Sequence, residues 1–166
     1  MGKPKSVADL LSYRVLRLSN TLALHSSRYY RAQFGLTLPE WRTMSVVGSR
    51  RSTTARDISR VLATDKGWVG ISVESLWRRG YLTRSTDKQD RRRTLLGLTT
   101  KGKEMHAVIL SAAQRRQRRL LAALPVDDAE RLIASLDRLQ TEADQMLKEL
   151  STQNKRGAPM SRDRTP

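Results

Sequence analysis

The feature that most constrains the fold is a pair of short amphipathic segments joined by a tight polar turn, within residues 53–79. Apolar residues recur at helical spacing in both segments: Ala55, Ile58 and Leu62, then Val69, Val73 and Leu76. Thr54 is typical of the first N-cap, and Thr64 or Asp65 is expected to cap the second helix. Gly80 suits the position just past its end. The pattern predicts a helix-turn-helix, although any helical hairpin of an all-α domain would look similar.

Two strand-like runs follow directly, LTRS at residues 82–85 and TLLGL at residues 94–98, on either side of the polar segment TDKQDRRR. This order predicts a β-hairpin with a long charged tip. A two-stranded hairpin is unstable alone, so it must pack against the helices. The predicted fold class is therefore mainly α with a small β-hairpin wing (α+β), a winged helix-turn-helix.

Helical periodicity predicts two helices before this domain. The first covers residues 6–33 and ends near Gly35. The second starts near Pro39 and ends at Gly48. Its predicted buried face consists of Trp41, Met44 and Val47.

Two further helices are predicted after the hairpin, over residues 100–124, where Pro125 stops the pattern, and over residues 127–150. The last one has apolar residues at alternating spacings of four and three: Leu132, Leu136, Leu139, Ala143, Met146 and Leu150. Such a heptad seam suits a partner helix, in the same chain or in a second chain. We favour a second chain, because two-fold dimers are the commonest oligomers and match palindromic DNA. Residues 151–166 are polar and basic and are expected to be a disordered tail.

The charge of the chain indicates a polyanion as its partner. The formal net charge is +16, and residues 1–100 hold 19 basic but only 7 acidic side chains. A generally basic surface would give the same total, so charge alone does not decide. In the hairpin tip, Arg91, Arg92 and Arg93 are consecutive and repel one another, which DNA phosphates would offset. An arginine at such a tip can also enter the minor groove, whereas the alternative is a solvated loop.

The residue inventory excludes several classes of function. The chain has no cysteine, which excludes disulfides and thiolate zinc sites, and its two histidines, His25 and His106, are far apart. Because no phosphate-cradling glycine loop and no nucleophile–base pair is found, we predict no enzyme, no metal site and no cofactor. No apolar run approaches the roughly 20 residues of a membrane span, and the N-terminus does not resemble a signal peptide. A cytoplasmic, nucleoid-associated protein is expected.

The second helix of the pair is expected to be the recognition helix, with its N-terminal residues facing base edges. Its candidate DNA contacts are Lys66, Trp68, Gly70, Ile71 and Ser75. Thr54, Arg56 and Lys66 lie near helix starts, where phosphates bind. Trp68 is either a base contact or a core residue, and together with Ile71 it could touch thymine methyl groups.

Three segments stand out beyond this pattern: FGLTLPEW at residues 34–41, WRRGYLTR at residues 77–84 and DRRRTLLGLTTKG at residues 90–102. Together with the order of elements, they resemble the MarR family of bacterial winged-helix transcriptional regulators, over roughly residues 8–150. The third segment is the most specific, because it is similar to the wing signature of the family. The matching residues are Asp90, Arg92, Leu98, Thr99 and Gly102.

The chain departs from the family pattern within the recognition helix. Many members carry Ser or Thr followed by Arg where this chain has Gly70 and Ile71. The missing arginine leaves direct readout of guanine without its usual partner. Gly67 and Gly70 each cost about 1 kcal/mol in a helix relative to alanine, and they either permit close approach to DNA or only weaken the helix.

The resemblance implies a homodimer in which two winged lobes grip adjacent major grooves of a pseudo-palindromic double-stranded DNA. Residues 1–34 and 101–150 would form the dimerisation helices, residues 35–100 the DNA-binding domain and residues 151–166 the tail. The implied dimer interface includes Leu10, Leu11, Leu132, Leu136, Leu139, Met146 and Leu150. In the wing, Arg91 would lie at the groove.

The resemblance also gives Asp90 a role, since it can brace the Arg92 side chain by a charged hydrogen bond. It further implies a repressor that leaves DNA when a small, often aromatic and anionic ligand binds between the lobe and the dimer region. Candidate ligand residues are Tyr13, Arg17, His25, Tyr29, Trp41 and Met44. Arg17 or His25 would hold a carboxylate, although a lone histidine on a helix is more often structural or exposed.

A rival hypothesis is a non-specific nucleic-acid-binding architectural protein that uses charge alone. Both hypotheses predict steep salt dependence of binding. Only the regulator predicts a large specificity ratio and a defined half-site spacing.

Overall fold

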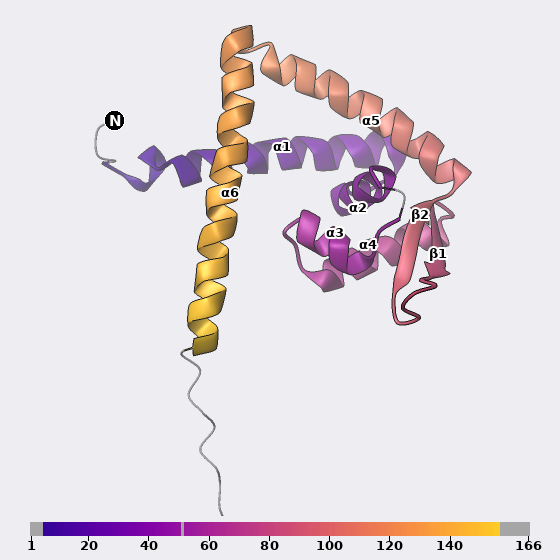
Figure 1. Ribbon diagram of the computed structural model, residues 1–166. Coiled ribbons are helices and arrows are strands. Elements are labelled where there is room, and N and C mark those ends of the chain that lie inside the picture. Colours follow the sequence, from indigo (N-terminus) through magenta and orange to yellow (C-terminus); the bar gives the residue numbers. More distant parts are fainter. Residues whose placement is uncertain (1–4, 51, 157–166) are drawn as a thin grey trace, which may run out of the picture. The chain divides into compact units, whose positions relative to one another are not determined.

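The computed structural model describes residues 5–50 and 52–156 (Figure 1). It confirms the predicted fold class, because it is mainly helical with one two-stranded antiparallel hairpin. The described residues up to Gln114 and those from Arg115 form two compact units. The boundary between the two units falls inside α5 (Thr100–Leu121). No helix in the described ranges has both the length and the apolar character that crossing a membrane requires.

The first unit begins with a short 3-10 helix, η1 (Val7–Asp9), and the long helix α1 (Leu11–Phe34). Gly35 ends α1 in the left-handed conformation, with a φ of 61°, as predicted. The next helix, α2 (Leu38–Gly48), is capped by Thr37, which exchanges hydrogen bonds with Glu40 in a capping box.

The end of α2 confirms the prediction that the helix ends at Gly48. Gly48 is the last helical residue. A Cβ at Gly48 would lie 2.7 Å from Nε2 of His106 on α5. The glycine therefore serves the close packing of α5 on α2, which only the tertiary structure imposes.

The predicted helix-turn-helix consists of α3 (Ala55–Val61) and α4 (Lys66–Arg78). Asp65, one of the two predicted candidates, caps α4 by accepting a hydrogen bond from the N–H of Gly67 at 2.7 Å. The predicted inner faces are buried around Ile58, Val69, Val73 and Leu76. After α4, Gly80 has a φ of 74°, a conformation that favours glycine, and this confirms it as the residue just past the helix.

The wing is the antiparallel hairpin of β1 (Leu82–Thr86) and β2 (Thr94–Leu98). On its other side, β2 exchanges two backbone hydrogen bonds between Leu96 and Thr53, the residue two positions before α3. Leu82 and Leu96 are buried, so the hairpin packs against the helices. This is expected, because an isolated two-stranded hairpin is only marginally stable.

The hydrophobic core of the first unit lies where α2, α3 and α4 gather beside the wing (Figure 1). The end of α1 and the middle of α5 contribute to it as well. Its largest fully buried side chains are Tyr30, Leu36, Met44, Ile58, Leu76 and Ile109.

The second unit contains the end of α5 and the helix α6 (Val126–Arg156). Helix α6 continues past residue 150, so residues 151–156 are helical, which corrects the predicted start of the disordered tail. Ser151 and Thr152 are compatible with the helix because their hydroxyls donate to backbone carbonyls four residues earlier, at 2.9 and 3.0 Å. The rest of the predicted tail, residues 157–166, lies outside the described residues.

Candidate nucleic-acid interface

The outer face of α4 carries two exposed apolar side chains. Trp68 is 64% exposed and Ile71 is 65% exposed, so Trp68 is not a core residue. Lys66 is exposed in the first turn of the same helix. A Cβ at Gly70 would meet no atom within 4 Å, so nothing in the described fold requires a glycine there.

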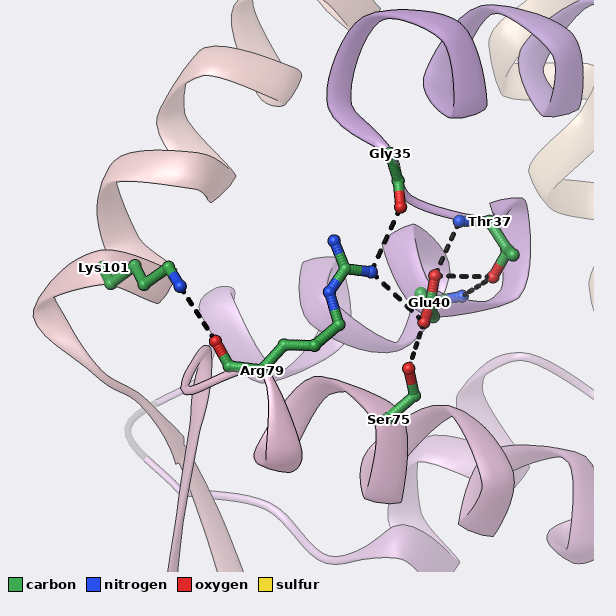
Figure 2. Close-up of polar contacts among 6 residues, drawn as sticks. All are labelled: Gly35, Thr37, Glu40, Ser75, Arg79 and Lys101. Carbon is green, nitrogen blue, oxygen red and sulfur yellow. Dashed lines mark hydrogen bonds and ion pairs between the residues drawn. The ribbon is translucent and has the colours of Figure 1, made fainter.

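The hydroxyl of Ser75 is engaged within the protein, although the sequence predicts Ser75 as a DNA contact. Its side chain is half-buried, and its hydroxyl donates a hydrogen bond to Oε1 of Glu40 on α2 (Figure 2). The other carboxylate oxygen of Glu40 accepts from the backbone N–H and the hydroxyl of Thr37, at 2.7 and 2.9 Å. A hydroxyl that donates to a buried carboxylate is not available to base edges. The prediction of Ser75 as a DNA contact is therefore corrected: its side chain joins α4 to α2.

Arg79, the C-cap residue of α4, completes this network (Figure 2). Its Nη1 donates to the carbonyl oxygen of Gly35 at 3.1 Å and lies 3.6 Å from Oε1 of Glu40. The backbone carbonyl of Arg79 accepts from Nζ of Lys101 at 3.0 Å. The network therefore connects the end of α1, the start of α2, the end of α4 and the start of α5.

The Glu40 carboxylate stays ionised in this network. Burial raises its pKa, but hydrogen bonds from Ser75 and Thr37 and the charge of Arg79 outweigh burial and hold the pKa below its ordinary value of 4.5. Sequence reasoning missed this role. The Thr37–Glu40 spacing of a capping box was a signal for the carboxylate, but nothing local points to Ser75.

A second carboxylate, Glu74, ties α4 to the wing. One of its oxygens accepts from Nε of Arg78 at 2.6 Å, and the other accepts from Nη2 of Arg84 on β1 at 2.7 Å. The Arg84 guanidinium also lies 4.5 Å from the centre of the Trp77 ring, a cation–π contact. Hydrogen bonds from Arg84 and Arg78 lower the pKa of Glu74, so its carboxylate stays ionised and accepts from both guanidinium groups.

Two aspartates hold the wing tip. Oδ1 of Asp90 accepts from the backbone N–H of Arg92 at 3.0 Å, and Asp87 lies 3.6 Å from Nη1 of Arg93. The predicted brace thus has a different form, since Asp90 fixes the backbone of Arg92 and not its side chain. A carboxylate reaches an N–H two residues ahead easily, as in an Asx turn. Within the described residues, Arg91 and Arg92 are exposed and make no ion pair, whereas Arg93 makes one.

The two phosphate candidates near the start of α3 differ. Thr54 is buried. Its hydroxyl donates to Oδ2 of Asp57 at 2.7 Å and accepts from the backbone N–H of Asp57 at 3.2 Å. The hydrogen bond from Thr54 lowers the pKa of Asp57, so the neighbouring carboxylate is negative. Thr54 is therefore corrected from a phosphate contact to a helix cap. Arg56 is exposed and makes no ion pair in the described part of the chain, so it stays a candidate.

Comparisons with known proteins show the family to which this fold belongs. Residues 36–102 match the family of the winged helix DNA-binding domain. The crystal structure of a MarR/EmrR family transcriptional regulator from Acinetobacter sp. ADP1 is similar at 30% identity and a TM-score of 0.75, over 81% of this chain and 94% of that chain. The chain belongs to the MarR family of winged-helix transcriptional regulators.

Two more comparisons accompany this assignment. The S. aureus MepR–DNA complex has a TM-score of 0.73 at 23% identity, over 81% of this chain and 98% of that chain. The HTH-type transcriptional regulator BilQ of Clostridium symbiosum (strain WAL-14163) is 25% identical over 93 residues, which are 56% of this chain and 65% of that regulator. The match to BilQ thus spans slightly less than two thirds of its length. As a member of a family of DNA-binding regulators, the MarR-family protein is not an enzyme.

Two residues of the MarR wing signature, Thr99 and Gly102, have structural roles. The Thr99 hydroxyl caps α5 by accepting from the N–H of Gly102 at 3.0 Å, and it donates to the carbonyl of Gly80 at 2.7 Å. A Cβ at Gly102 would lie 2.1 Å from the backbone oxygen of Tyr81 and 3.4 Å from Leu98, so only glycine fits without a shift. These contacts hold the start of α5 against the end of α4 and the base of the wing, and they thereby position the hairpin that carries the tip arginines.

The six predicted ligand residues fall into two groups. Those on α1 are exposed or half-buried: Tyr13, Arg17, His25 and Tyr29. The other two are core residues, which corrects their assignment. Trp41 is buried with its ring centre 5.8 Å from that of Tyr30 and 5.5 Å from that of His106, and Met44 is fully buried.

The predicted dimerisation residues of the MarR-family protein are exposed in the single chain, between 40% and 58%. They are Leu10, Leu11, Leu132, Leu136, Leu139, Met146 and Leu150. Each unit thus leaves large apolar side chains exposed. Among the described residues, no group of three or more His, Cys, Asp or Glu side chains is placed to hold a metal ion.

Proposed function

We propose that this MarR-family protein is a homodimeric repressor that binds a pseudo-palindromic operator and is released by a small carboxylated aromatic ligand. One observation carries the DNA-binding part. The first unit presents the outer face of α4 together with a wing tip whose Arg91 and Arg92 are exposed and make no ion pair within the described residues. The MepR–DNA complex, which has the same fold, supports DNA as the partner.

The two elements suit the two grooves of B-form DNA. The N-terminal half of α4 would enter the major groove, and the wing arginines would enter the adjacent minor groove, where the potential is most negative. Arg56 and Lys66 would contact phosphates. Each protomer would read one half-site, and occupation of the operator would block transcription.

The exposed apolar side chains of α6, together with Leu10 and Leu11, support a homodimer. Leaving that many large apolar side chains in water is costly, and a second copy of the chain would cover them. We expect size-exclusion chromatography with light scattering to show twice the mass of one chain. Leu139→Asp should shift the protein to a monomer, whereas Asp137→Asn, beside the seam, should leave the dimer intact.

Exposed and half-buried side chains on α1 support a ligand with a carboxylate and a ring. Arg17 supplies a cation, and Tyr29 stacks on His25 with ring centres 6.0 Å apart. A panel of aromatic carboxylates should raise the melting temperature and weaken DNA binding of the intact protein, and Arg17→Ala should reduce both effects. If no compound moves either quantity, the ligand part of the proposal fails.

Selection from random duplex DNA at about 150 mM salt tests the function itself, because long-range charge attraction is then screened beyond about 8 Å. An enriched pseudo-palindrome, with half-sites about one helical turn apart, is the expected result. No enrichment, together with binding that collapses as salt rises, would instead identify a charge-driven architectural protein.

A further inference from the structure

The face of α4 that would enter the major groove is apolar. Trp68 and Ile71 are three positions apart, so they lie on one side of the helix, and they are 64% and 65% exposed. Single exposed apolar side chains are common on protein surfaces. Two large ones together, on the helix that would face base edges, leave apolar area uncovered at the place where DNA would bind. An open depression continues along α4 from Gly67 and Gly70 towards Glu74.

The guanidinium groups at the C-terminal end of α4 and on the neighbouring strand β1 are held within the protein itself. Arg78 and Arg84 donate to the same carboxylate, that of Glu74, at 2.6 and 2.7 Å. Arg79 donates to the carbonyl at the end of α1 at 3.1 Å. Guanine is usually read by both donors of a guanidinium fork, so each arginine would first have to leave these contacts. In the described α4 and its C-cap, Lys66 is the cation that makes no ion pair or hydrogen bond.

From these two observations we infer that this recognition helix reads thymine, through apolar contact of Trp68 and Ile71 with the C5-methyl group. Thymine is the base that presents an apolar group in the major groove. The operator half-sites would therefore be defined by the placement of A·T pairs that turn this methyl group towards α4. The inference rests on the proposed function, because it assumes that α4 enters the major groove of an operator.

Gly70 fits this mode of reading. A Cβ there would meet nothing within 4 Å, so the fold of the described residues would accept a larger side chain. Glycine in a helix interior is unfavourable relative to alanine. The missing side chain lets the helix backbone approach the base edges closely, which a short-range contact between Ile71 and a methyl group needs.

Exposed charge near this face matches a nucleic acid rather than a protein groove. Arg56, Lys66, Arg91 and Arg92 are exposed on the first unit and make no ion pair within the described residues. Phosphates would supply their countercharge, whereas an apolar protein partner would leave it unmatched. DNA is therefore the occupant to which this apolar face is assigned.

Uracil provides the test, because a thymine-to-uracil change removes the C5-methyl group and keeps base pairing and charge. Each thymine of the selected operator would be replaced singly, and the affinity of the intact protein would be measured at constant salt. At the thymines that face α4 we expect about a fourfold loss per methyl group, corresponding to about 0.8 kcal/mol. Thymines outside the half-sites should show no loss.

Variants then assign the effect to side chains. Ile71→Ala and Trp68→Ala should weaken binding to the thymine operator and should remove the thymine–uracil difference at distinct positions. Val61→Ala, which truncates an apolar side chain at the end of α3 that is 49% exposed, should keep the full difference. Gly70→Ala should weaken binding without unfolding the protein, as circular dichroism would verify.

The failures of the two proposals are distinguishable. If the operator is bound selectively but uracil is tolerated at every half-site position, thymine reading is wrong and the regulator stands. If 7-deazaguanine, which lacks the N7 acceptor, weakens binding instead and Arg78→Ala abolishes that loss, guanine reading replaces it. If selection enriches no duplex, the proposed function fails and this inference fails with it.

Discussion

The hydroxyl of Ser75 on α4 donates a hydrogen bond to the buried carboxylate of Glu40 on α2, 35 residues away in the chain. The same carboxylate caps α2 through Thr37 and lies 3.6 Å from Nη1 of Arg79. One acidic group thus fixes α4 relative to α2 and, through Arg79, relative to the end of α1. The angle at which α4 meets DNA would depend on this contact.

Replacing this carboxylate should weaken both folding and DNA binding. Glu40→Gln removes the ion pair with Arg79 and leaves buried hydrogen-bond donors with a poorer acceptor. We expect the free energy of unfolding to fall by about 1–3 kcal/mol, the usual cost of a buried group left unsatisfied. Urea denaturation at pH 7 measures it. Glu104→Gln, at an exposed position on α5, is the matched control and should be nearly neutral.

The same pair of proteins should differ in their response to acid. The pKa of Glu40 is lowered below 4.5 in the folded state, so its contribution to stability is complete above pH 4.5. It is lost as pH falls below 4.5 through the folded pKa. We expect Glu40→Gln to lose less stability than the unaltered protein over this window, while other carboxylates titrate equally in both. Equal losses of stability in the two proteins would mean that the Glu40 carboxylate does not hold α2 and α4 together.

His106 should make stability depend on pH nearer neutrality. Its ring packs between Gly48 and Trp41, and burial lowers its pKa below 6.5. The unfolded chain therefore binds a proton more readily, and stability falls as pH drops from 6.5 through the folded pKa. Comparing urea unfolding at pH 7.5 and 5.5 should show the loss. In His106→Gln the difference should shrink, and an unchanged difference would assign it to other groups.

Two glycines should respond in opposite ways to the same substitution. Gly102→Ala places a Cβ 2.1 Å from the backbone oxygen of Tyr81. A backbone atom cannot move away by a change of rotamer, as the end of a flexible side chain can. We expect a loss of about 1–3 kcal/mol in unfolding free energy, typical of overpacking. Gly70→Ala enters open space and should gain up to about 1 kcal/mol through helix propensity. Thermal and urea denaturation of both variants would measure the contrast, and a destabilised Gly70→Ala would contradict it.

Neighbouring wing arginines should differ in their importance for DNA. Arg92→Ala removes an exposed guanidinium without an ion pair in the described residues, and we expect at least about a tenfold loss of affinity with a salt dependence reduced by about one charge. Arg93→Ala removes a guanidinium that already pairs with Asp87, so its effect should be smaller. Fluorescence anisotropy at several salt concentrations measures both. Normal binding by Arg92→Ala would show that the wing tip does not contact DNA.

Much of the fold was predictable because its signals are local. The faces of α3 and α4, the caps at Thr54 and Asp65 and the left-handed glycines depend on residues within about four positions of each other. The hairpin was visible for the same reason, since two alternating runs flank one polar segment. The position of the three arginines within that segment is enough to assign them to the wing tip.

Side-chain assignments in the interface needed the tertiary structure. Exposure of Trp68 depends on which side of α4 packs on α2, and the sequence left both outcomes open. The commitment of Ser75 to Glu40, and of Arg84 to Glu74, depends on contacts between separate elements. Spacing along the chain carries no information about such pairs.

The sequence by itself determined the order of helices and strands, most of their ends, the basic wing and the family. Only the tertiary structure decided which polar side chains pair with one another inside the protein and which stay exposed. The physical reason is that capping and periodicity act within one or two turns of backbone, whereas hydrogen bonds between helices depend on how whole elements pack. The apolar face of α4, with Arg78, Arg79 and Arg84 held by other groups of the protein, is the clearest result of that packing.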